Sequence, residues 1–168
     1  MKITLNAISD FIVENNLDAI GIYPNTDPGS YDIIEAIDEI DCNRIHFFKT
    51  LPRNIFVNLM RSAKALAGNS SMGILEAPFY KMPVINIGDR QQGRLNAGNV
   101  EFVNYDKDNI ISALEKAVFD NVYRNKIENI VNPYGDGKAD EKIVSFLKTI
   151  DLSDKTWLIK RKLFGSQR

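Results

Sequence analysis

The residues with the clearest potential for chemistry lie in the stretch GNSSMGILEAP, from Gly68 to Pro78. It follows a short apolar run and is predicted to begin a helix. Ser70 and Ser71 would lie at the helix start, where free backbone N–H groups and the helix dipole favour an anion such as a phosphate. Glu76 would lie about a turn and a half into the helix. A carboxylate repels a phosphate at close range, so Glu76 better suits a neutral diol such as a ribose.

Ordinary structural roles are the alternative for these residues. Serine caps many helices without binding any ligand, and Glu76 could be a solvated helix residue. The neighbours of Glu76, Leu75 and Ala77, are apolar and favour a position that faces a cleft.

The spacing of apolar residues predicts the elements that position this stretch. Strands are expected at 19–23, 44–48, 64–67, 83–87 and 100–103, and helices at 3–15, 30–40, 51–60, 70–76, 110–118, 122–130 and from about 140. This alternation predicts an α/β fold: a Rossmann-like three-layer domain with a parallel sheet and helices on both faces. Ligands of such sheets bind beyond the carboxyl ends of the strands. Because Asn25, Ser70, Ser71 and Arg90 all follow predicted strands, we expect them at one edge of the sheet.

Length and composition restrict the class of protein. The chain has 168 residues, which suits one domain, predicted at 1–150, followed by a basic tail or extra helix at 151–168. The net charge of −1 argues against nucleic-acid or membrane binding. Cys42 is the single cysteine, so no disulfide can form within the chain, and a cytoplasmic location is predicted.

His46 is the single histidine and lies in the predicted buried strand 44–48. A structural role is expected for it, so the sequence favours neither a Ser-His-Asp triad nor a histidine zinc site. No metal cluster and no cofactor are predicted.

Four motifs in order carry a resemblance to a known family. They are YPNTDPGS at 23–30, GNSSMGILEAP at 68–78, PVINIGDRQQGR at 83–94 and NPYGDG at 132–137. Together they resemble the C-terminal half of UDP-N-acetylglucosamine 2-epimerases, in particular the hydrolysing type that supplies sialic acid synthesis. The resemblance covers nearly all of residues 18–150.

The resemblance implies a GT-B architecture, in which two Rossmann-like domains face each other across a cleft and the C-terminal one holds UDP. It assigns Ser70 and Ser71 to the diphosphate, Glu76 to the ribose, Arg90 to the phosphates, Phe56 to the uracil and Asn25 to the cleft. Phe56 could instead be a core residue, Arg90 a surface charge and Asn25 a turn residue. Gln91 and Arg94 are further candidates, and the 132–137 turn is expected to be structural.

The resemblance also implies a reaction for the intact enzyme. Loss of the C2 proton and anti elimination of UDP would give a 2-acetamidoglucal, and water would then yield N-acetylmannosamine. The family is about twice as long as this chain, and its acid–base residues lie mainly in the N-terminal domain. His46 does not match the family histidine near the phosphates.

We therefore expect no catalytic residue in this chain, weak binding of UDP or UDP-N-acetylglucosamine, and no activity alone. The missing N-terminal domain is the expected partner, and a homodimer is an open alternative. Another GT-B glycosyltransferase domain and a non-catalytic nucleotide-binding module remain alternative functions.

Overall fold

A computed structural model describes residues 1–26, 28–151 and 153. The chain divides into two compact units, Met1–Tyr134 and Gly135–Arg168. The boundary expected at residue 150 stays a prediction, and nearly all of the predicted tail lies outside the described residues.

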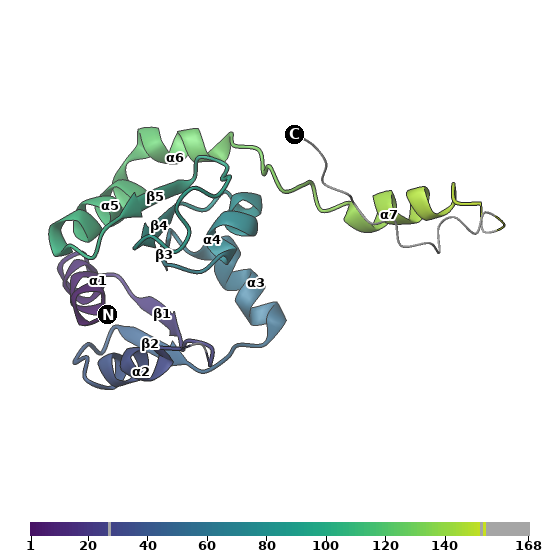
Figure 1. The fold of residues 1–168 in the computed structure, drawn as a ribbon. Helices are drawn as coiled ribbons and strands as arrows, with labels where there is room; N and C mark the ends of the chain where they lie inside the picture. The colour runs from purple at the N-terminus through teal and green to yellow at the C-terminus, as the bar shows by residue number, and fades with distance from the viewer. Residues whose placement is uncertain (27, 152, 154–168) are drawn as a thin grey trace, which may run out of the picture. The chain divides into compact units, whose positions relative to one another are not determined.

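The elements of the first unit alternate as the sequence predicts (Figure 1). The strands are β1 (Ala19–Ile22), β2 (Ile45–Phe48), β3 (Leu66–Gly68), β4 (Val84–Ile87) and β5 (Val100–Val103). The helices are α1 (Lys2–Glu14), α2 (Ser30–Asp38), α3 (Arg53–Ser62), α4 (Met72–Leu75), the 3-10 helix η1 (Ala77–Tyr80), α5 (Lys107–Phe119) and α6 (Asn121–Glu128). The expected α/β class is confirmed.

The described strands form two parallel sheets rather than the single sheet that we expected. β1 pairs with β2, while β4 lies between β3 and β5. The sheets nevertheless share one core, because Ala19 of β1 and Ile45 of β2 pack against the cluster that contains Ile85 and Ile87 of β4.

β4 is buried along its whole length because helices cover both of its faces. Ile85 and Ile87 pack with residues of α1 and α5, which lie beside each other in Figure 1. Val84 packs on the other side with Met60 of α3 and Ala77 of η1. This arrangement confirms the three predicted layers around the β3–β5 sheet.

The expected burial of His46 is wrong. β1 and β2 alternate between half-buried and exposed residues, and His46 lies on the exposed face with Ile20, Ile22 and Phe48. Sequence patterning identified the strand correctly. It could not show that one face of this two-stranded sheet lacks the cover that β4 receives on both sides.

The second unit contains α7 (Ala139–Leu147), so the helix predicted from about residue 140 is confirmed. Its apolar residues Ile143, Val144, Phe146 and Leu147 are all exposed. Across the described parts of the chain, no helix combines the length and apolarity that crossing a membrane requires.

Candidate functional site

The loops after β3 and β4 begin side by side at one edge of the three-stranded sheet. Gly68, the last residue of β3, pairs in register with Asn86 of β4. Both strands run in the same direction, so their carboxyl ends open toward the same edge. The loop after β3 carries Ser70 and Ser71, and the loop after β4 carries Arg90.

Ser70 and Ser71 begin a helix that is shorter than expected. The Ser70 hydroxyl accepts a hydrogen bond from the backbone N–H of Met72 at 3.3 Å, as in an ordinary cap. Its own O–H remains as a donor. Ser71 is the N-cap residue of α4, and its side chain makes no capping bond.

The expected position of Glu76 inside a longer helix is wrong, because α4 has four residues and ends at Leu75. Pro78 lies in the first turn of η1, which follows directly. Proline has no N–H and clashes with a preceding helical turn, so the α-helix cannot continue through it. Glu76 therefore lies at the junction of α4 and η1.

Arg53 links two of the predicted site residues. Its guanidinium lies 3.6 Å from a carboxylate oxygen of Glu76 and 5.9 Å from the centroid of the Phe56 ring. Arg53 and Phe56 are three residues apart on α3, so they share one helix face. Sequence reasoning missed Arg53, although its spacing from Phe56 was a usable indication. The Arg53 and Glu76 side chains are 72% and 44% exposed, so this ion pair is weak.

The loop from residue 88 to 95 is held by hydrogen bonds at its start. The Asn86 side chain donates to the carbonyl of Gly88 at 2.9 Å, and the Gly88 N–H donates to Val103 at 2.8 Å. Gly88 has a φ of 87°, and a Cβ there would come within 2.4 Å of the Tyr105 hydroxyl. Only glycine satisfies both the backbone conformation and the space.

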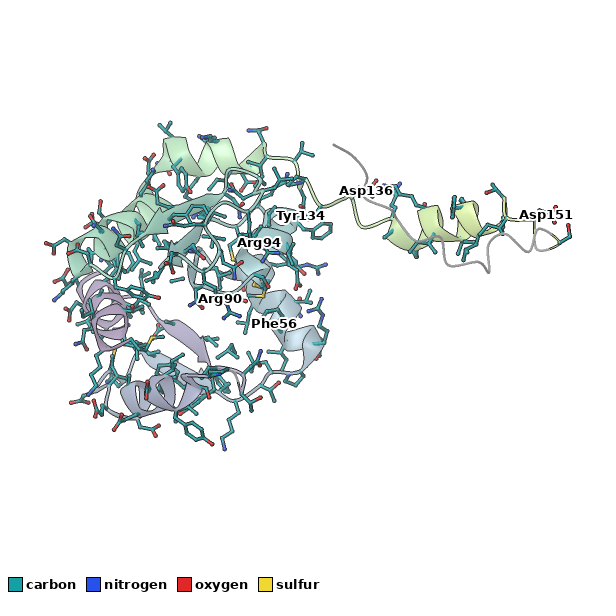
Figure 2. The ribbon with its side chains drawn as sticks, in the orientation of Figure 1. Phe56, Arg90, Arg94, Tyr134, Asp136 and Asp151 are labelled. Atoms are coloured by element: carbon teal, nitrogen blue, oxygen red, sulfur yellow. The ribbon has the colours of Figure 1, made fainter. Side chains whose placement is uncertain are left out.

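Gln91 occupies the centre of this loop and is only 3% exposed. Its amide nitrogen donates to the carbonyl of Asn69 at 3.0 Å, and its amide oxygen accepts from Arg94 at 2.7 Å. One buried side chain thus joins the loop after β3 to the loop after β4. Arg90 precedes Gln91 directly and Arg94 follows it by three residues, and both are exposed. Figure 2 labels both arginines.

Three polar residues that our sequence reasoning did not name as site residues bond to α4, to the segment before β4 and to the end of the 88–95 loop. Asn99 is fully buried, and its amide donates to the carbonyls of Gly73 and Met82 at 3.2 and 3.1 Å. Asn132 donates to the carbonyl of Leu75 at 3.1 Å. Tyr134, labelled in Figure 2, donates its hydroxyl to the carbonyl of Leu95 at 2.8 Å. The 132–137 motif therefore contains two residues that contact α4 and the 88–95 loop.

Asn25 follows a strand of a different sheet from the other candidate residues. It is exposed and follows β1, in the two-stranded sheet, whereas Ser70, Ser71 and Arg90 follow strands of the other sheet. Its predicted role near a cleft stays a prediction.

Of the candidate residues, Ser70 and Arg90 are exposed, and Ser71 and Glu76 are half-buried. Two shallow hollows lie elsewhere, one along α2 near Tyr31 and Asp38 and one between β5 and α5 near Glu101 and Lys116. Within the described residues, no cluster of three or more histidine, cysteine, aspartate or glutamate side chains could hold a metal ion. The arrangement offers hydroxyl and guanidinium donors to an anion, with a carboxylate and an aromatic ring nearby.

Fold and site together define a Rossmann-like α/β domain with candidate anion-binding loops at the carboxyl edge of its sheet. The family profile described as UDP-N-acetylglucosamine 2-epimerase matches residues 1–148. The chain belongs to this family.

Individual relatives agree with this assignment. The UDP-N,N'-diacetylbacillosamine 2-epimerase (hydrolyzing) of Legionella pneumophila is 35% identical over 90% of this chain and 39% of its own length. The UDP-N-acetylglucosamine 2-epimerase of Neisseria meningitidis is 35% identical over 58% of this chain and 26% of its own.

A solved structure of the Methanocaldococcus jannaschii UDP-GlcNAc 2-epimerase, in complex with UDP-GlcNAc and UDP, superimposes with a TM-score of 0.66 at 25% identity. The superposition covers 88% of this chain and 40% of that protein. The chain thus spans well under half the length of these relatives.

Proposed function

We propose that this chain is the UDP-binding part of a hydrolysing UDP-N-acetylglucosamine 2-epimerase and that it has no catalytic activity alone. Family membership supports the activity class, and the solved M. jannaschii relative carries UDP-GlcNAc and UDP. The short span relative to these proteins supports a partner domain that supplies the remaining chemistry. A cytoplasmic location and a link to sialic acid precursor synthesis belong to the same proposal.

The observation that carries the proposal is the hydrogen bond of 3.0 Å between the Gln91 amide and the Asn69 carbonyl. It joins the segment that contains Ser70 and Ser71 to the loop that contains Arg90. Hydroxyl donors and a guanidinium on adjoining loops suit the two phosphates of UDP.

In the proposed reaction these groups act on the leaving UDP. Breaking the C1–O bond places additional negative charge on the diphosphate, and donors already held in place stabilise that charge. Glu76 would accept hydrogen bonds from the ribose hydroxyls, and Phe56 would line the uracil. Arg53, which contacts both residues, would have to share Glu76 with the ribose.

The sugar has a second candidate. The Legionella pneumophila relative, which aligns with most of this chain, is named for UDP-N,N'-diacetylbacillosamine rather than UDP-N-acetylglucosamine. Both substrates carry UDP, so the residues described above would serve either one. Release of free sugar from each substrate by the chain combined with its N-terminal domain distinguishes them.

Binding of UDP is tested by the unfolding temperature of the chain with and without saturating nucleotide. Bound ligand stabilises the folded state by mass action, so UDP should raise the unfolding temperature. Glu76→Ala and Arg90→Ala should each reduce this rise. Arg61→Ala removes an exposed arginine from the other end of α3 and should leave it unchanged. The proposal is wrong if saturating UDP neither shifts the unfolding temperature nor releases heat in a titration.

A further inference from the structure

We propose that Gln91 is a positioning residue that sets the geometry of the diphosphate donors through the Asn69–Ser70 peptide and Arg94. This inference rests on the proposed UDP site and assigns a role to a side chain that would not itself touch the nucleotide. The side chain is 3% exposed and makes hydrogen bonds at both ends of its amide.

Burial makes this amide unusual for a loop residue. A polar side chain removed from water costs free energy unless its hydrogen bonds are replaced. Gln91 replaces them with one bond to each of the two elements that carry the candidate phosphate ligands, Asn69 on one side and Arg94 on the other. Its neighbour Gln92 is exposed and has no such role.

The first bond fixes the orientation of a peptide group. The carbonyl of Asn69 and the N–H of Ser70 belong to one planar trans peptide, so they point in opposite directions. Because the carbonyl is held toward the buried amide of Gln91 at 3.0 Å, the Ser70 N–H points away from that amide. Loss of the bond would let this peptide rotate and misdirect a donor next to the proposed diphosphate.

The second bond fixes a guanidinium. Arg94 Nη1 donates to the Gln91 amide oxygen at 2.7 Å. A guanidinium has five N–H donors, so this bond leaves four for an anion. A single amide group therefore holds the Asn69–Ser70 peptide and the Arg94 guanidinium in a fixed relation.

The Gln91 amide supplies both the donor and the acceptor that this arrangement needs. A carboxylate keeps the acceptor for Arg94 but cannot donate to the Asn69 carbonyl. Gln91→Glu therefore separates the two bonds while keeping the size of the side chain, and Gln91→Ala removes both.

The experiment compares UDP with uridine by calorimetric titration of the full chain. Uridine lacks the diphosphate, so its affinity reports the ribose and uracil contacts alone. Gln91→Ala and Gln91→Glu should each weaken UDP binding about tenfold, from lost hydrogen bonding, and change uridine binding by less than about twofold. Gln92→Ala, the matched control, should alter neither affinity.

A double-variant cycle tests whether Gln91 acts through Arg94. If it does, Gln91→Ala combined with Arg94→Ala should weaken UDP binding by clearly less than the product of the two single effects. Additive effects would overturn the role through Arg94, and equal losses of UDP and uridine affinity in both Gln91 variants would overturn the positioning role as a whole. If Gln91→Ala fails to fold, Gln91→Glu still tests the bond to the Asn69 carbonyl through the comparison of UDP with uridine. Absence of UDP binding by the unmodified chain would instead overturn the proposed function.

Discussion

The loops at the ends of the two sheets differ in how they are held. After β3 and β4, buried amides bond directly to loop backbone: Gln91 to Asn69, and Asn86 to Gly88. After β1, the segment with Asn25 is exposed and follows a sheet whose outer face carries Ile20 and Phe48 in contact with solvent. Both ends have the polar composition that suggests a binding site.

This difference shows that polar composition alone does not determine whether the backbone of a loop is fixed. A loop can hold donors in place only if its backbone is fixed, and here side-chain amides from neighbouring elements fix it. The β3–β5 region contains these amides, which is why we propose the diphosphate site there. The β1–β2 region would at most add a residue to the ligand's edge.

Replacement of Asn99 should have the largest effect, and it tests the difference between the β3–β5 and β1–β2 regions. Asn99→Ala leaves the buried carbonyls of Gly73 and Met82 without their donor, which should lower the free energy of unfolding by about 2–4 kcal/mol. Asn25→Ala, at an exposed position after β1, should change it by less than about 0.5 kcal/mol. Urea denaturation measures both, and similar losses would remove the contrast.

Raising the pH above 10 should change the stability by an amount between the effects of the Asn99 and Tyr134 replacements. Burial, with a smaller contribution from the Glu101 carboxylate, raises the pKa of Tyr123 to about 12. The folded state then holds the phenol proton more tightly than the unfolded state, whose tyrosine pKa is about 10. The stability from this group is complete below pH 10 and is lost as the pH rises toward 12.

Tyr123→Phe should therefore reduce the fall in unfolding temperature between pH 10 and pH 12. The pKa of Tyr23, beside β1, is also raised by burial and by Asp38, but this side chain is near the surface. Tyr23→Phe should have the smaller effect on the pH dependence. A larger effect for Tyr23 would reverse the comparison.

Loss of the Tyr134 hydroxyl should have the smallest effect. Tyr134→Phe removes the bond to the Leu95 carbonyl, but both residues are exposed, so water replaces the donor. We expect a loss of about 0.5 kcal/mol in the free energy of unfolding. Tyr31→Phe on α2, where the side chain is 84% exposed, is the matched control and should show no loss. Equal values for the two variants would mean that this brace adds nothing to stability.

The sequence predicted the alternating elements because their apolar spacing is local information. The run VINI at 84–87 indicated a buried strand and forms one. The early end of α4 was missed, although Pro78, two residues after Glu76, was a usable indication of it.

Long-range contacts were not visible in the same way. The burial of Gln91 depends on a carbonyl 22 residues earlier, and that of Asn99 on carbonyls 26 and 17 residues earlier. Polar residues in a turn-rich stretch of sequence do not show which distant backbone groups they will bond. The exposure of His46 likewise depends on which elements cover its strand, not on the strand itself.

Hydrogen exchange of the chain, measured with and without saturating UDP, tests the central claim most directly. Binding at the carboxyl edge of the β3–β5 sheet should slow exchange in peptides that cover 68–76 and 88–95, because ligand contacts protect backbone amides from opening. Peptides that cover the start of α6 should exchange at an unchanged rate, because Arg124 there bonds to the carbonyl of Lys64 before the amino end of β3. Slowed exchange confined to residues 19–49, or no change in any peptide at saturating UDP, would contradict the account.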